Sequence, residues 1–204
     1  MRRPASTARR VPNDADSAGA SRPASKPASR PASRPASGVA RGRPVLATCI
    51  VVGVVLADQL TKAWAVRELA DGPVWLVGSD IGFRLARNTG SAFSLFRGFT
   101  PLLAVLAIFV AFFLVRAVRR TDDLLLVVSL SLILGGALGN LVDRLFRAPG
   151  FLRGGVVDFI GVSSFPTFNV ADSAVTIGAV LLAAWAIRAD IRERREEPGE
   201  AADA

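Results

Sequence analysis

The sequence predicts an all-α membrane protein with four transmembrane helices. Two observations support this fold class: 51% of the 204 residues are hydrophobic despite 25 Lys and Arg, and the apolar residues gather in four long runs. Runs of this length are what an α-helix needs to cross the hydrocarbon core of a bilayer. The predicted spans are residues 44–66, 101–115, 124–142 and 170–187.

The N-terminal segment 1–43 differs from the rest of the chain because it is polar and basic. It holds ten of the basic residues and contains four consecutive Pro-Ala-Ser repeats, each opened by Arg or Lys, over residues 22–37. Proline at every fourth position prevents a regular helix, and the segment has no apolar face to bury. We expect a disordered basic tail at 1–43, a membrane domain at 44–188 and a charged C-terminal tail at 189–204. Nucleic-acid binding is not favoured, because no aromatic residue is interleaved with the charges.

The order of the spans and the positions of the basic residues predict the topology. The first run begins near residue 44, too far along the chain for an ordinary secretory signal, so we expect a retained span. Pro101 suits the first turn of the second helix, and the link 116–123 has room only for a turn. The two tails and this link hold 17 of the 25 basic residues, and the two opposite loops hold seven. The positive-inside rule then places both termini in the cytoplasm.

The composition excludes several kinds of catalytic site. The chain has no His, no Tyr and a single cysteine, Cys49. It therefore lacks a Ser-His-Asp triad, a Cys-His pair, a His-based zinc site and an internal disulfide. Cys49 in an apolar run is most simply a small packing residue. Carboxylates remain as the candidates for acid–base chemistry.

Two sets of polar residues lie at the outer ends of the first and third predicted spans. Asp58 and Lys62 are four residues apart and share a helix face, so they are either a structural ion pair or a functional one. Asn140, Asp143 and Arg144 crowd the end of the third span, where Asp143 and Arg144 are also candidates for an ordinary interfacial ion pair. The glycines before them, Gly135 and Gly139 in GGALGNLVDRL, have the small-xxx-small spacing that permits close helix packing.

Two further carboxylates flank the start of the last span. Asp158 lies in the short strand or loop GGVVDFI, where its apolar neighbours should raise its pKa. Asn169 and Asp172 are three apart in FNVADSAVTIG, and Asn169 also suits a helix cap. If Asp158 and Asp172 lie close together, one keeps a proton while the other is ionised. Such a pair can activate a water molecule for attack on a peptide carbonyl.

Five sequence blocks resemble the signal peptidase II family of bacterial membranes, in that family's order: DQLTK (58–62), NTGSAF (88–93), GNLVDR (139–144), VVDF (156–159) and FNVAD (168–172). The resemblance implies an aspartyl endopeptidase that cleaves diacylglyceryl-modified prolipoproteins immediately before the lipidated cysteine. It implies that Asp158 and Asp172 are catalytic. It also implies a supporting role for seven residues: Asn88, Asn140, Asp143, Arg144, Asn169, Asp58 and Lys62.

The resemblance carries further expectations about structure and partners. It implies a small β-rich cradle outside the membrane, between the first and second helices, and a partial lid before the fourth. It implies no metal and no organic cofactor. The expected partners are the lipidated prolipoprotein and membrane lipid, with activity as a monomer in the bacterial cytoplasmic membrane and an active site facing outwards. The alternatives from residues alone are a small proton-coupled transporter and a non-catalytic scaffold.

Overall fold

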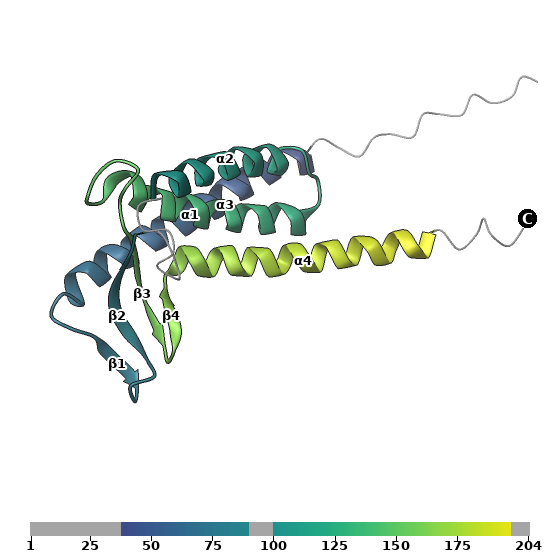
Figure 1. The fold of residues 1–204 in the computed structure, drawn as a ribbon. Helices are drawn as coiled ribbons and strands as arrows, with labels where there is room; N and C mark the ends of the chain where they lie inside the picture. Colours follow the sequence, from purple (N-terminus) through teal and green to yellow (C-terminus); the bar gives the residue numbers. More distant parts are fainter. Residues whose placement is uncertain (1–37, 90–99, 197–204) are drawn as a thin grey trace, which may run out of the picture. The chain divides into compact units, whose positions relative to one another are not determined.

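The computed structural model describes residues 38–89 and 100–196, which form four long helices and one four-stranded sheet (Figure 1). Residues 1–37, which include the repeats, and residues 197–204 of the predicted C-terminal tail lie outside the described residues. In chain order the elements are α1 (Gly38–Glu68), β1 (Val74–Val77), β2 (Ile81–Asn88), α2 (Thr100–Val118), α3 (Leu124–Phe146), β3 (Val156–Val162), β4 (Phe165–Phe168) and α4 (Val170–Glu196).

All four helices are long and apolar enough to cross a membrane, which confirms the predicted membrane architecture. Many of their large apolar side chains are exposed, among them Phe109, Phe112 and Phe113 of α2. In a bilayer such side chains contact acyl chains instead of water. Helices α1 and α4 extend well beyond the predicted spans: Pro44 lies inside α1, and α4 continues through the Arg- and Glu-rich segment after residue 187, where strong helix formers follow one another.

Helix α3 packs against the three other helices, and glycines make this possible. A side chain at Gly135 would place its Cβ 2.9 Å from Cβ of Val54 on α1, and one at Gly139 would lie 2.8 Å from Oδ2 of Asp58. On α4, Gly178 has the same role, because a Cβ there would lie 2.8 Å from the carbonyl oxygen of Ser129. The predicted packing role of Gly135 and Gly139 is confirmed.

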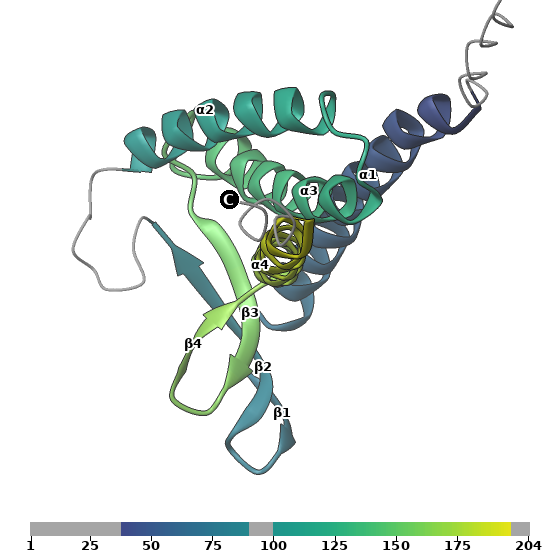
Figure 2. The same cartoon turned by 90° about the vertical axis from the view of Figure 1, so that its right-hand side faces the viewer.

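The sheet is antiparallel, with strand order β1-β2-β3-β4 (Figure 2). Strands β1 and β2 follow α1, as the predicted cradle requires. Strands β3 and β4 come from the segment between α3 and α4, so the two interhelical segments build one sheet. The register places Asp158 opposite Ala86, and Val156 opposite Asn88.

Aromatic side chains fix this sheet to the C-terminal end of α1. Ala65, Leu69 and Phe159 form a buried apolar cluster, against which Phe83 also packs. The ring of Trp64 on α1 lies 5.3 Å from that of Phe83 and 6.1 Å from that of Phe159, measured between centroids. Such edge-to-face contacts are favourable beyond the area they bury. Strand β3, which carries Asp158, is therefore held rigidly beside the helices.

Candidate active site

The first turn of α4 is fixed by a reciprocal cap that includes Asp172. The backbone N–H of Asp172 donates to Oδ1 of Asn169 at 2.9 Å, and the backbone N–H of Asn169 donates to Oδ2 of Asp172 at 3.2 Å. Each side chain thus satisfies an N–H group that the start of a helix leaves free. The predicted capping role of Asn169 is confirmed, and the cap sets the position of the Asp172 carboxylate.

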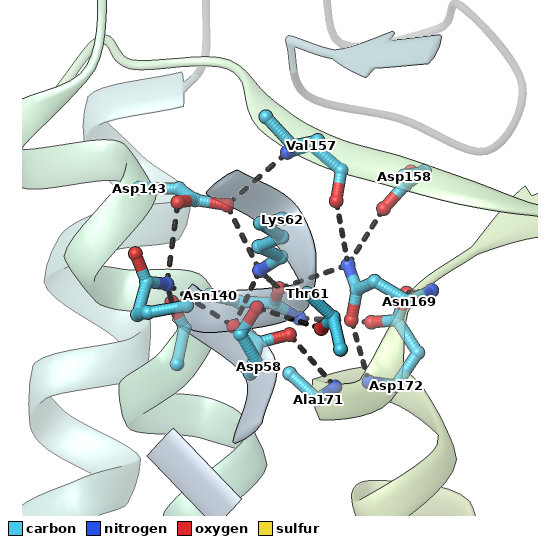
Figure 3. Close-up of polar contacts among 12 residues, drawn as sticks. Asp58, Thr61, Lys62, Asn140, Asp143, Val157, Asp158, Asn169, Ala171 and Asp172 are labelled. Atoms are coloured by element: carbon cyan, nitrogen blue, oxygen red, sulfur yellow. Dashed lines mark hydrogen bonds and ion pairs between the residues drawn. The ribbon is translucent and has the colours of Figure 1, made fainter. Parts of the chain in front are cut away.

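The same asparagine connects Asp172 to Asp158 (Figure 3). Its Nδ2 donates to Oδ1 of Asp158 at 2.6 Å and lies 3.3 Å from the carbonyl oxygen of Val157. The Asn88 side chain also hydrogen-bonds the Asp158 carboxyl. Asp158 is only 4% exposed. Burial, and then the nearby charge of Asp172, raise the pKa of Asp158 to about 6, as its apolar neighbours in the sequence predict.

Asp158 and Asp172 line one cavity of about 600 Å³. Strand β4 forms one wall, and the first turns of α4 form another through Ser173, Thr176 and Ile177. The hydroxyls of Ser173 and Thr176 donate to carbonyl oxygens four residues earlier in the chain. The cavity therefore presents two carboxyl groups and the Asn88 amide within largely apolar walls.

Behind the aspartates, Lys62 occupies the centre of a buried ion cluster. Its Nζ lies 2.7 Å from Oδ2 of Asp58, 2.8 Å from Oδ2 of Asp143 and 2.9 Å from Oδ1 of Asn140. An ammonium has three N–H donors, and all three are used. Lys62, Asp58 and Asp143 have no exposed surface. The predicted Asp58–Lys62 ion pair is present, and the structure adds Asp143 to it.

The cluster is hydrogen-bonded to the Asp172 side chain and to the backbone next to Asp158 and Asp172. Nδ2 of Asn140 donates to Oδ1 of Asp172 at 2.8 Å. Oδ1 of Asp58 accepts the N–H of Ala171 at 3.0 Å, and Oδ2 of Asp143 accepts the N–H of Val157 at 3.1 Å. Ala171 and Val157 each directly precede one of the two aspartates. The ion cluster therefore holds the backbone on which both carboxyl groups are carried.

Arg144 brings a positive charge close to both aspartates. Its guanidinium interacts electrostatically with Asp172, Asp143 and Asp158, and its Nη1 donates to the carbonyl oxygen of Asn140 at 3.2 Å. Nε of Arg144 is buried and has no hydrogen-bond partner among the described residues. The expected Asp143–Arg144 ion pair is not among the salt bridges of the described residues, because Asp143 is held by Lys62 and by Nε of Arg147 at 2.5 Å.

Two members of the cluster were not predicted. Arg147 is four residues after Asp143, a helical spacing from which the pair is predictable. The contacts of Gln59 cannot be predicted from spacing along one helix. Its Nε2 lies 3.1 Å from Oδ2 of Asp58, 3.0 Å from the carbonyl oxygen of Gly139 and 3.3 Å from Oδ1 of Asp143, contacts that depend on how α1 packs against α3.

Residues 50–188 match the family model described as signal peptidase (SPase) II, and this range contains both aspartates and the whole ion cluster. The chain belongs to the signal peptidase II family. It is 51% identical over 135 residues to the lipoprotein signal peptidase of Rhodococcus jostii, covering 65% of this chain and 68% of that one. It is 46% identical over 143 residues to that of Mycobacterium tuberculosis H37Rv, covering 70% of each chain.

The fold agrees with this membership. A solved structure described as a bacterial membrane enzyme superposes on the signal peptidase with a TM-score of 0.62 at 28% identity, covering 76% of this chain and 93% of that one. The protein is an aspartic peptidase that cleaves the signal peptides of prolipoproteins. The transporter and scaffold alternatives are therefore wrong.

Removing the buried ammonium should destabilise this peptidase strongly. In Lys62→Met, Asp58 would lose its ion pair and Asp143 would keep only Arg147, at an expected cost of about 3–5 kcal/mol. Thermal unfolding in detergent measures the loss. The matched control is Arg194→Gln, which breaks the exposed Arg194–Asp190 pair on α4 and should cost less than about 1 kcal/mol. Equal melting temperatures for Lys62→Met and the control would contradict the role of the cluster.

Proposed function

We propose that Asp158 and Asp172 are the catalytic pair of this lipoprotein signal peptidase. The observation that supports the proposal is that both carboxyl groups line one cavity and both accept from Asn169, Asp158 from the side-chain Nδ2 and Asp172 from the backbone N–H. Two carboxyl groups in one apolar pocket do not ionise together cheaply, so they share a proton at working pH. This is the arrangement that aspartic peptidases need for a general base and a general acid.

The contacts support a division of roles between the two carboxyls. Oδ1 and Oδ2 of Asp172 each accept an N–H group, which suits the ionised form. Asp158 is buried and its pKa is raised to about 6, which suits the protonated form. Asp172 then removes a proton from a water molecule, whose oxygen attacks the scissile carbonyl carbon. Asp158 donates its proton to the carbonyl oxygen, and collapse of the intermediate passes a proton to the leaving amine.

The remaining residues position and polarise this pair. Asn169 and Asn140 orient the carboxyls by hydrogen bonds, and Asn88 lines the cavity beside Asp158. Asp58, Lys62 and Asp143 hold the backbone from behind. Arg144 supplies positive charge near both aspartates.

The apolar walls of the cavity suit a lipid-modified substrate. We assign the cleavage site to the bond before a diacylglyceryl-modified cysteine, with its acyl chains in the bilayer beside α4. Ile177, which lines the cavity, and Val180 on the next turn are 54% and 63% exposed. They would offer a continuous apolar path from lipid to the carboxyls. No second chain is needed to complete the pair, which supports activity as a monomer.

The basic residues support an orientation with both termini in the cytoplasm and the cavity facing outwards. The α2–α3 link and the end of α4 carry seven Arg, and this is the end of the bundle away from the sheet. The positive-inside rule retains such segments in the cytoplasm. In this arrangement residues 1–43 and 189–204 are cytoplasmic tails flanking the peptidase domain at 44–188.

Replacing either aspartate with asparagine should abolish cleavage. We expect kcat for a purified diacylglyceryl-prolipoprotein to fall by at least about 10³-fold in Asp158→Asn and in Asp172→Asn, because each removes one proton-transfer group. The matched control is Asp71→Asn, an exposed aspartate outside the cavity, which should cleave at the wild-type rate. A folded Asp158→Asn or Asp172→Asn enzyme that cuts at near wild-type rate would exclude that residue from the pair.

The pH dependence of cleavage should follow the proton on Asp158. Because the free enzyme loses that proton near pH 6, kcat/KM should fall about tenfold per pH unit above this value. A bound substrate excludes water and raises the pKa further, so kcat should begin to fall at a higher pH than kcat/KM does. Rates measured across the pH range with the folded enzyme check this. A kcat/KM that stays constant from pH 5 to beyond about pH 8 would assign the proton elsewhere.

A further inference from the structure

Strand β4 forms a wall of the cavity that we assign to the substrate. It is paired with β3 at only two positions. Phe165 and Phe168, its first and last residues, are paired with Val162 and Ile160 of β3, with a register irregularity between the two pairings. No strand of the described residues lies beside the other edge of β4. All four residues of β4 line the cavity, so the shape of the cavity depends on whatever else holds this strand.

Arg84 of β2 forms additional hydrogen bonds to β4. Its Nε donates to Oγ1 of Thr167 at 2.8 Å, and its Nη2 donates to the carbonyl oxygen of Phe165 at 3.4 Å. Strand β2 is not a neighbour of β4, because β3 lies between them (Figure 2). The Arg84 side chain therefore crosses the whole width of β3 to reach β4, and it binds both a side chain and the backbone there.

The crossing depends on a glycine in β3. Gly161 is paired with Gly82, close to Arg84 in the sheet. A Cβ at Gly161 would lie 3.1 Å from Nε of Arg84 and 3.4 Å from its Cγ and Cδ. The missing side chain leaves room for the arginine to lie flat on the strand. The pairing of β2 with β3 is also irregular between Phe83 and Ala86, where Arg84 lies.

We propose that Arg84 is a positioning residue for the substrate: by crossing Gly161 and holding Thr167 and Phe165, it fixes the β4 wall of the cavity. This inference rests on the proposed placement of the substrate in that cavity. The hydrogen bonds of Arg84 go to β4 and not to Asp158 or Asp172. Arg84 therefore acts on how tightly the substrate is held against the wall, and the proton transfers proceed without it.

Steady-state kinetics of the full-length enzyme with a diacylglyceryl-prolipoprotein, at fixed detergent concentration, test this role. Arg84→Gln should raise KM about five- to tenfold, while kcat stays within about twofold and its pH profile is unchanged. Arg84→Lys should recover only part of the loss, because one ammonium does not replace the two-pronged guanidinium contact. The matched control is Arg87→Gln, an exposed arginine on the same strand, which should leave both constants unchanged.

Two further variants test the contact without removing the arginine. Thr167→Val deletes the acceptor, and Gly161→Ala obstructs the crossing, so each should raise KM by several-fold. Combining Arg84→Gln with Thr167→Val should add little to either change alone, because both break one interaction. If Arg84→Gln unfolds, Thr167→Val and Gly161→Ala decide the question.

An unchanged KM in folded Arg84→Gln or, where it unfolds, in Thr167→Val would overturn the inference. So would strictly additive effects in the double variant, or a fall in kcat with KM unchanged. These outcomes leave the catalytic pair intact as long as Asp158→Asn abolishes cleavage. Cleavage by Asp158→Asn would instead refute the proposed catalytic pair, whatever Arg84→Gln shows.

Discussion

The active-site region depends on one buried ammonium. Lys62 of α1 uses its three N–H donors on Asp58 of its own helix and on Asp143 and Asn140 of α3. Because these acceptors in turn hold the N–H groups of Val157 in β3 and Ala171 in α4, a single charge connects three helices and the sheet. A buried charge of this kind is costly unless its partners are placed with accuracy. Its presence therefore selects one packing of the elements over others of similar apolar burial.

That packing explains how two carboxyl groups come to line one cavity. Each of them follows directly after a residue whose N–H group is fixed by the cluster, and Asn169 donates to both, from its side chain to Asp158 and from its backbone N–H to Asp172. The glycines of α3 allow the helices to approach closely enough for these short contacts. The ion cluster and the helix contacts hold the helices together. The two proposed catalytic carboxyls are not needed for this packing, so one can be protonated while the other is ionised. Strand β4, held by Arg84, closes the remaining side of the cavity.

Much of this arrangement was predictable from the sequence, because membranes restrict what polar residues can do. Local patterns predict four features that the structure confirms. These are the four spans, the Asp58–Lys62 pair at helical spacing, the Asn169 cap and the raised pKa of Asp158. What was not predictable depends on contacts distant in sequence. Three contacts arise only when separate elements pack together. Asp143 pairs with Lys62 and not with Arg144, Gln59 bonds to α3, and Arg84 reaches over Gly161.

The proton shared by Asp158 and Asp172 can be observed directly. Infrared spectra of the isotope-labelled enzyme, recorded between about pH 4 and pH 8, report the C=O stretch of protonated carboxyl groups. We expect a band that titrates near pH 6 in the wild type, is absent in Asp158→Asn, and remains in Asp172→Asn with its titration moved to lower pH, since the neighbouring charge is gone. A band that persists in Asp158→Asn and disappears in Asp172→Asn would contradict the assignment of the proton to Asp158.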